Sequence, residues 1–185
     1  SPLFCESSRR WKAVAISMGA SYHIWNADEV DTLIKERYAW LFKDYQTTRY
    51  PVMRCDMGRV AILHAYGGIY SDLDCFPPRS EYRKAPLAAC RTHVRDSRKK
   101  LFLDMEVLIA GRRNPILVKW LKHMQERMHS IKFSKPGSHW YNAKMRYIWW
   151  TTGPLSMAGF LKSEADARKQ NGQEPLVVEH LCTNR

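Results

Sequence analysis

Residues 54–78 read RCDMGRVAILHAYGGIYSDLDCFPP and are the most informative part of the sequence. Just before it, Pro51 predicts the start of a helix, because proline is tolerated at the first helical position. The apolar residues recur at helical spacing as far as Gly67-Gly68, and glycines are typical of a helix end. Residues 69–76 then read as a strand, which two prolines end. The sequence therefore predicts a helix, a tight turn and a strand.

Two carboxylates stand near the end of that strand, at Asp72 and Asp74. Alternate residues of a strand point to the same face, so both side chains are expected to project together. Paired carboxylates suit Mg²⁺ or Mn²⁺, which keep several waters and take further ligands from substrate phosphates. In an open α/β sheet, ligands bind at the carboxyl ends of strands. A bare Asp-x-Asp is more often a solvated strand end or an Asx turn, so the context decides.

The preceding helix carries a second charged pair, Asp56 and Arg59. Residues three apart on a helix are neighbours on one face. They could simply form a surface salt bridge, which is worth little energetically. Because the helix runs directly into the glycine turn and the strand, its charged face could instead lie beside Asp72 and Asp74.

The rest of the chain predicts strands that alternate with helices. The expected strands are 13–17, 21–25, 101–110 and 175–181, and the expected helices are one capped by Asn26 and reaching Phe42, one from Asn114-Pro115, and one from Pro154 to near Gly172. This alternation favours an α/β fold around a largely parallel sheet. The 185 residues contain no linker or internal repeat, so a single domain over residues 1–185 is expected.

Residues 56–74, DMGRVAILHAYGGIYSDLD, resemble the signature of the DXD-containing glycosyltransferases. That group includes fungal mannosyltransferases that act on inositol phosphoceramide or start outer-chain N-glycans. The resemblance is specific, because an Asp-x-x-Arg pair, an apolar helix, a glycine pair and the DXD must agree in order and spacing. Weaker similarities are the segment from Trp11 to Trp25, Asp104, residues 110–115 and the turn Thr152-Gly153-Pro154.

The resemblance implies a GT-A type nucleotide-sugar transferase fold with a mostly parallel central sheet. It implies that a hexose (mannose, galactose or glucose) is transferred with retention of configuration from a nucleotide-diphosphate sugar, GDP-mannose or a UDP-hexose. The acceptor would be a glycan or a glycolipid such as inositol phosphoceramide, and the metal would be Mn²⁺ or Mg²⁺. The family also implies a lumenal domain at a Golgi or other secretory-pathway membrane.

At the positions that match the family motif, the resemblance implies donor-binding roles for residues around the glycine turn. Asp56 and Arg59 would hold hydroxyls of the donor sugar. Tyr70 would line the donor pocket, next to the glycines Gly67 and Gly68.

The same resemblance assigns the metal. Asp72 would face the ribose and the metal, and Asp74 would ligate the metal directly, so both join Asp56 and Arg59 in the expected catalytic set. His180 could be the C-terminal histidine that relatives place near the metal. Relatives also begin with a strand resembling IHxxW that reaches the nucleotide base, and this chain starts after it, so the N-terminal strand of the fold is expected to be missing.

The net charge of +12 comes from 30 Lys and Arg against 18 Asp and Glu. The whole excess lies in residues 79–146, which hold 17 basic and 5 acidic residues. We expect this region to serve a phosphate-bearing acceptor or an anionic membrane surface. The alternative is a basic binding module, or an inactive transferase, that binds anionic lipid or nucleic acid without catalysis. Nucleic acid is not the expected partner, because no RRM, zinc-finger or helix-turn-helix signature is present.

Other motifs carry less weight. The absence of P-loop, GxGxxG and GxSxG sequences argues against nucleotide hydrolysis, dinucleotide chemistry and serine hydrolysis. Pairs at Cys90/His93 and His180/Cys182 are a weak zinc candidate, because reliable four-ligand spacing is missing. Five aromatic residues between 140 and 150 are expected to pack in the core, with a stacking platform for acceptor sugars as the alternative.

Overall fold

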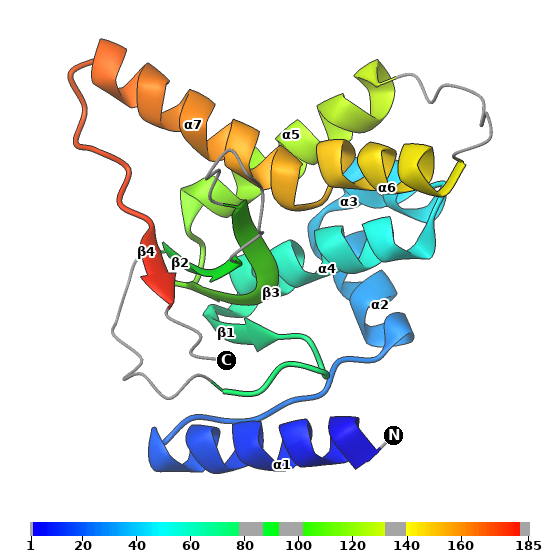
Figure 1. The fold of residues 1–185 in the computed structure, drawn as a ribbon, viewed down its shortest axis with the longest axis vertical. Helices are drawn as coiled ribbons and strands as arrows, with labels where there is room; N and C mark the ends of the chain where they lie inside the picture. The colour runs from blue at the N-terminus through cyan, green and yellow to red at the C-terminus, as the bar shows by residue number, and fades with distance from the viewer. Residues whose placement is uncertain (1, 78–86, 93–101, 132–139, 182–185) are drawn as a thin grey trace.

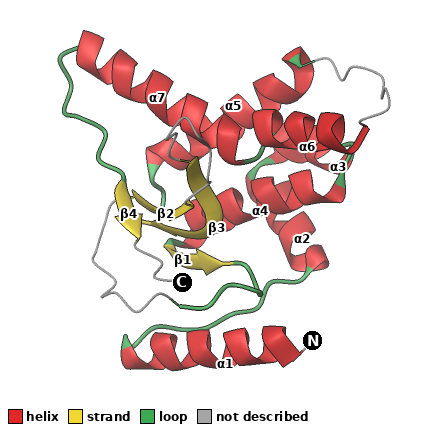
Figure 2. Cartoon of the chain, viewed as in Figure 1, coloured by secondary structure: helices red, strands yellow, loops and turns green. Residues whose placement is uncertain are grey.

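The computed structural model describes residues 2–77, 87–92, 102–131 and 140–181 (Figure 1). The elements, in chain order, are α1 (Pro2–Ser17), α2 (Ala27–Arg37), α3 (Ala39–Gln46), α4 (Pro51–Tyr66), β1 (Gly68–Ser71), β2 (Leu87–Thr92), β3 (Phe102–Ala110), α5 (Pro115–Ser130), α6 (Trp140–Thr151), α7 (Pro154–Gln170) and β4 (Glu179–Leu181). Figure 2 shows a small sheet with helices gathered mainly on one side of it. The fold is therefore mixed α/β, as the alternating pattern predicts.

The described strands form one sheet in the order β1-β3-β2-β4. Strand β3 pairs antiparallel with both β1 and β2, and only β2 and β4 pair in parallel. The prediction of a mostly parallel sheet is thus wrong for these strands. Nine residues, 93–101, join β2 to β3, and a parallel crossover needs a dozen or more.

Hydrophobic packing occurs on both faces of the sheet. Leu108 and Ala110 of β3 belong to the main core, which packs the sheet against α2, α3, α4, α5 and α7. The alternating residues Val107 and Ile109 instead join Trp11 of α1 in a smaller cluster. Figure 1 accordingly shows α1 apart from the other helices, beyond β1. The DXD follows β1 in the chain, and its segment contacts α1, because the Ser7 hydroxyl and the Trp11 indole nitrogen both donate to the Cys75 carbonyl.

Several local predictions are confirmed. Asn26 caps α2, since its side chain accepts a hydrogen bond from the Glu29 backbone and Glu29 returns one, a capping box. Asn114 caps α5, with Pro115 in the first turn. The helices that start at Pro51 and Pro154 are α4 and α7.

Other local predictions are wrong. Residues 13–17 lie in α1, and residues 21–25 form no strand with the described part of the sheet. The helix expected from Asn26 to Phe42 is broken at Tyr38, whose backbone is not helical. Tyr38 is buried and its hydroxyl donates to the Ala61 carbonyl at 3.1 Å, so a tertiary contact lies at the break.

The DXD does not lie on a strand. Strand β1 ends at Ser71, and residues 72–75 form a turn in which the Cys75 backbone donates to the Asp72 carbonyl. The expectation that alternate strand positions align Asp72 with Asp74 is therefore wrong. The final strand is also shorter than predicted and covers only Glu179–Leu181.

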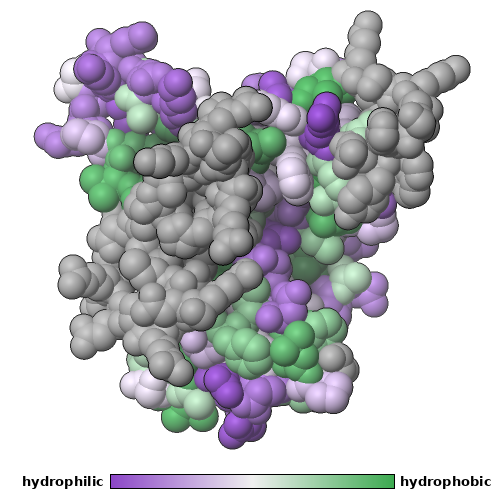
Figure 3. Space-filling view, in the orientation of Figure 1, coloured by the Kyte–Doolittle hydropathy of each residue, from purple (hydrophilic) through white to green (hydrophobic). Residues whose placement is uncertain are grey.

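Two tryptophans of α6 do not pack in the core. Trp149 and Trp150 are 44% and 48% exposed, so core packing is the wrong expectation for this pair. The end of α7 is also solvent-facing, and its hydrophilic residues form the purple projection at the top left of Figure 3.

Candidate active site

Helix α4 positions the first charged pair. Asp56 and Arg59 are 5% and 7% exposed, although they are charged, because this face of α4 packs inward. Their side chains approach to 3.3 Å between Asp56 Oδ1 and Arg59 Nη2. The predicted i,i+3 pair is therefore confirmed as a contact, but as a buried one rather than a surface salt bridge.

A glycine turn brings β1 back along α4. Gly67 ends the helix with φ of +71°, a conformation that favours glycine. A Cβ at Gly67 would lie 2.6 Å from the Arg112 backbone nitrogen, so a side chain could not fit there. The turn places Tyr70 and Asp72 beside Arg59, about two helical turns back from the helix end.

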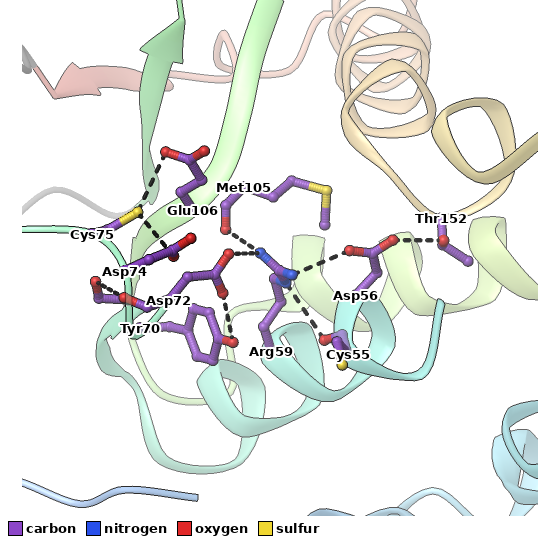
Figure 4. Close-up of polar contacts among 11 residues, drawn as sticks. Cys55, Asp56, Arg59, Tyr70, Asp72, Asp74, Cys75, Met105, Glu106 and Thr152 are labelled. Atoms are coloured by element: carbon purple, nitrogen blue, oxygen red, sulfur yellow. Dashed lines mark hydrogen bonds and ion pairs between the residues drawn. The ribbon is translucent and has the colours of Figure 1, made fainter. Parts of the chain in front are cut away.

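Arg59 is the centre of the resulting network (Figure 4). Its Nη1 lies 3.1 Å from Asp72 Oδ2 and donates to the Met105 carbonyl at 2.7 Å. Its guanidinium carbon sits 5.3 Å from the centre of the Tyr70 ring. The Tyr70 hydroxyl completes the network by donating to Asp72 Oδ1 at 2.9 Å. One guanidinium therefore holds the carboxylates of two different elements.

A residue with no predicted role joins this network from the other end of the sequence. Thr152, fully buried at the corner between α6 and α7, donates from Oγ1 to Asp56 Oδ2 at 2.7 Å. The Thr152-Gly153-Pro154 turn was a sequence signal for this position, but no pattern pointed to its partner.

When both are ionised, Asp56 and Asp72 carry two negative charges, and Arg59 supplies one positive charge between them. Burial raises the pKa of Asp56 to about 6, against the opposing effects of Arg59 and the Thr152 hydrogen bond. Burial likewise raises the pKa of Asp72, and Arg59 again opposes the shift. The cluster carries a net negative charge when both are ionised. A cation or a hydrogen-bond donor from a ligand would therefore be favoured beside it.

The second aspartate of the DXD has different surroundings. Asp74 is exposed, and no basic side chain in the described part of the chain forms a salt bridge with it. The neighbouring Cys75 donates its thiol to Glu106 Oε2 at 3.4 Å, and burial raises the pKa of that thiol. The structure thus gives the two aspartates separate environments, with Asp72 engaged by protein groups and Asp74 open to solvent.

Part of this network borders a large cleft of about 1340 Å³, whereas Asp56 and Thr152 lie behind its lining. Its walls come from α1, the 20–25 segment, α2, α4 and β1, and they include Gly67, Gly68, Arg59, Tyr70, Asp72 and Asp74. The polar network occupies one wall, and apolar side chains such as Trp11 and Ile62 occupy others. A concave site with a few convergent polar groups is the usual form of a small-molecule site.

Comparison with known families agrees with this arrangement. Residues 7–88 match the family described as glycosyltransferase sugar-binding region containing DXD motif. This segment is a DXD-motif glycosyltransferase region. The DXD region includes α4, β1 and the DXD turn, and the Thr152 corner lies outside it.

Curated relatives point the same way. Over 146 residues the chain is 32% identical to mannosyl phosphorylinositol ceramide synthase CSH1 of Saccharomyces cerevisiae, covering 79% of the chain and 35% of that protein. It is 30% identical over 149 residues to the synthase SUR1 of the same yeast, covering 80% and 35%. Inositol phosphoceramide mannosyltransferase 1 of Schizosaccharomyces pombe is 24% identical over 142 residues, covering 76% and 40%.

The chain spans about a third of the length of the two Saccharomyces proteins. Among the residues that the structure describes, no helix combines the length and apolar character that a membrane span needs.

The predicted metal ligands of the DXD region are only partly assembled. Within the described ranges, no three His, Cys, Asp or Glu side chains form a group that could hold a metal ion. The His180 backbone lies in β4 opposite Ala89, with β2 and β3 between it and β1. Its side chain is not described, so its role as a ligand stays a prediction. For the zinc candidate, His93 and Cys182 lie outside the described residues.

Proposed function

We propose that this chain forms the donor-binding part of a retaining hexosyltransferase that uses a nucleotide-diphosphate sugar. The observation that carries the proposal is the Asp56–Arg59–Asp72 network of the DXD region, in which Arg59 and Asp72 border the cleft and the buried Asp56 lies behind Arg59. Mannose is the favoured hexose, because three relatives are named for mannosyl transfer or mannosyl products. Galactose and glucose remain in the proposal until donors are compared directly.

The network is suited to binding sugar hydroxyls. Asp56 and Arg59 would hold the donor sugar, with carboxylate oxygens accepting and guanidinium N–H groups donating. Tyr70, Gly67 and Gly68 border the same cleft and would shape its wall. Because these groups are fixed by one another before any ligand arrives, little reorganisation would accompany binding.

The DXD would supply the metal site. Asp74 offers an exposed carboxylate. Its oxygens are hard ligands of the type that Mn²⁺ or Mg²⁺ prefers, so this residue fits such a metal. Asp72 would contribute second, its Arg59 contact keeping its orientation, and His180 would be a third protein ligand. A metal bound there would stabilise the charge that develops on the leaving diphosphate. The protein itself would orient the donor and exclude water from the buried side of the network.

We further propose that the chain belongs to a GT-A type fold. The support is the helix–turn–strand arrangement of the DXD region, with β1 returning along α4. No residue is assigned as a covalent nucleophile. In the proposed reaction an acceptor hydroxyl would attack the anomeric carbon from the face that the nucleoside diphosphate leaves, so that the new glycosidic bond forms as the bond to the diphosphate breaks and the hydroxyl proton passes to the departing phosphate.

The proposed acceptor is a glycan or a glycolipid such as inositol phosphoceramide, presented at an anionic membrane surface. Support comes from α6, whose twelve residues include five aromatic, two basic and no acidic side chains. Trp149 and Trp150 are both exposed, and the guanidinium carbon of Arg127 lies 5.9 Å from the centre of the Trp150 ring. Amphipathic aromatic and basic side chains are typical of membrane interfaces. A Golgi or other secretory-pathway membrane, with the domain in the lumen, is the matching location.

A screen of GDP-mannose, UDP-glucose and UDP-galactose by thermal shift, with and without Mn²⁺, tests the proposal. A ligand that binds the native state raises its melting temperature. The alternative, a binding module or an inactive transferase, predicts salt-dependent binding to anionic vesicles and no metal-dependent response to any sugar donor.

A further inference from the structure

The Thr152 hydroxyl joins the last quarter of the chain to the donor site. It donates to Asp56 Oδ2 at 2.7 Å, between residues 96 apart in the sequence. Thr152 has no exposed surface and Asp56 has 5%, so water does not readily replace this bond. Figure 4 shows the hydroxyl on the opposite side of Asp56 from Arg59.

The corner that carries Thr152 is held from both sides. The backbone nitrogens of Thr152 and Gly153 both donate to the Ile148 carbonyl, at 3.0 and 2.9 Å, and so end α6. A Cβ at Gly153 would lie 3.0 Å from the Trp149 Cα, so glycine permits the close approach to α6. Pro154 then begins α7. The position of the hydroxyl is therefore set by two packed helices rather than by a loose loop.

Asp56 consequently has one partner for each oxygen. Oδ1 faces Arg59 Nη2 at 3.3 Å, and Oδ2 accepts from Thr152. A carboxylate held at both oxygens has a fixed plane. Without the hydroxyl, Oδ2 would be a buried acceptor with no partner, which is costly. The side chain would then have to rotate away from Arg59 or take up a proton.

We propose that Thr152 is a positioning residue of the donor site, which acts by fixing the plane of the Asp56 carboxylate against Arg59. The inference rests on the proposed function, in which Asp56 holds donor hydroxyls. It assigns Thr152 no contact with the substrate. It also gives the α6–α7 corner, which lies outside residues 7–88, a direct influence on donor binding.

The chain offers a closely matched control. Thr151 is the adjacent residue and is equally buried. Within the described part of the chain, its hydroxyl bonds only to carbonyls of its own helix, those of Tyr147 and Ile148. Thr152→Val and Thr151→Val therefore make the same isosteric change at neighbouring positions. Thr152→Ser keeps the hydroxyl, and Thr152→Ala provides a second comparison with Ser if the valine variant does not fold.

The experiment measures kcat and KM for GDP-mannose, UDP-glucose and UDP-galactose with Mn²⁺ in the full-length protein. For the donor that is used, Thr152→Val is expected to lower kcat/KM by about tenfold to a hundredfold, as loss of a hydrogen bond to a charged group does. Thr152→Ser and Thr151→Val are expected to stay within about threefold of wild type. Equal losses in Thr152→Val and Thr151→Val, or no rescue by serine relative to alanine, would overturn the proposal.

A carboxyl titration of Asp56 by NMR distinguishes failure of this inference from failure of the proposed function. Losing the hydroxyl should shift the Asp56 titration midpoint to higher pH in Thr152→Val and leave it unchanged in Thr151→Val. If no nucleotide sugar is turned over, the proposed function fails, and this titration alone decides the positioning role. An unchanged midpoint in Thr152→Val would reject that role.

Discussion

Arg59 Nη1 lies 3.1 Å from Asp72 Oδ2, so the middle of α4 is ion-paired to the residue that follows β1. The same guanidinium faces Asp56 through Nη2 and donates to the Met105 carbonyl of β3. Three elements thus meet at one side chain. Removing it would leave two partly or fully buried carboxylates facing each other without a counter-charge.

The first prediction concerns stability. Arg59→Ala should lower the free energy of unfolding by about 3–5 kcal/mol, because breaking a buried ion pair leaves uncompensated buried charge. The control is Arg9→Ala, which removes the exposed Glu6–Arg9 pair at the same i,i+3 spacing. That change should cost far less, because an exposed ion pair contributes little to stability. Urea unfolding measures both, and similar costs for the two variants would count against a buried network.

The second prediction separates metal binding from folding. Asp74→Asn should abolish the Mn²⁺-dependent part of donor binding and activity. Because Asp74 is exposed, this change should lower the free energy of unfolding of the ligand-free protein by about 0.5 kcal/mol or less, so its melting temperature should hardly change. Asp166→Asn, at an exposed position on α7, should change neither property. Manganese-dependent binding that survives Asp74→Asn would remove Asp74 from the metal site.

The third prediction is a pH dependence. Burial raises the pKa of Asp56 from 3.8 to about 6, so the protonated form is favoured in the folded state. Its contribution to stability is therefore fully present below pH 3.8 and is lost as the pH rises through about 6. Donor binding, which needs the ionised carboxylate, should increase over the same range.

Urea unfolding between these pH values measures the effect, with Asp56→Asn as the comparison. Arg59, Thr152 and Asp72 are the groups that act on Asp56. The pH dependence left in Asp56→Asn would belong partly to Asp72, whose pKa burial also raises. An Asp56→Asn variant with the full wild-type pH dependence would show that another group is responsible.

The fourth prediction concerns the membrane surface. Replacing both Trp149 and Trp150 with Ala should weaken binding to phosphatidylcholine vesicles that contain phosphatidylinositol by about tenfold, since aromatic area would no longer be buried. Trp40→Ala is the control, because Trp40 is 40% exposed but lies on α3. Cosedimentation measures the binding. An equal loss of vesicle binding in the double variant and in Trp40→Ala would argue against a surface on α6 that is specific for anionic lipid. Equal binding of the unchanged protein to vesicles without phosphatidylinositol would argue against it too.

Local rules predicted much of the DXD region. Pro51 and the Gly67-Gly68 pair mark the two ends of α4, and the steric contact at Gly67 explains why a glycine is required there. The i,i+3 spacing correctly placed Asp56 beside Arg59. These features depend on helix geometry and on turn stereochemistry, both of which act over a few residues.

Features that depend on distant contacts were not predictable. The short apolar run at 13–17 fits either a strand or a helix, and packing of Trp11 on β3 accompanies the helical outcome. Whether β3 runs parallel or antiparallel depends on the strands with which it pairs, and no local sequence pattern identifies those strands. Thr152 finds its partner 96 residues away, so the sequence could mark its turn but not its role.

The most direct measurement is isothermal titration of the full-length protein with GDP-mannose, UDP-glucose and UDP-galactose, with Mn²⁺ and with EDTA. We expect saturable binding of at least one donor with Mn²⁺, loss of that binding with EDTA, and the same loss in Asp74→Asn with Mn²⁺ present. Absence of binding by all three donors in folded protein, or binding that is indifferent to both EDTA and Asp74→Asn, would contradict a metal-dependent sugar-donor site.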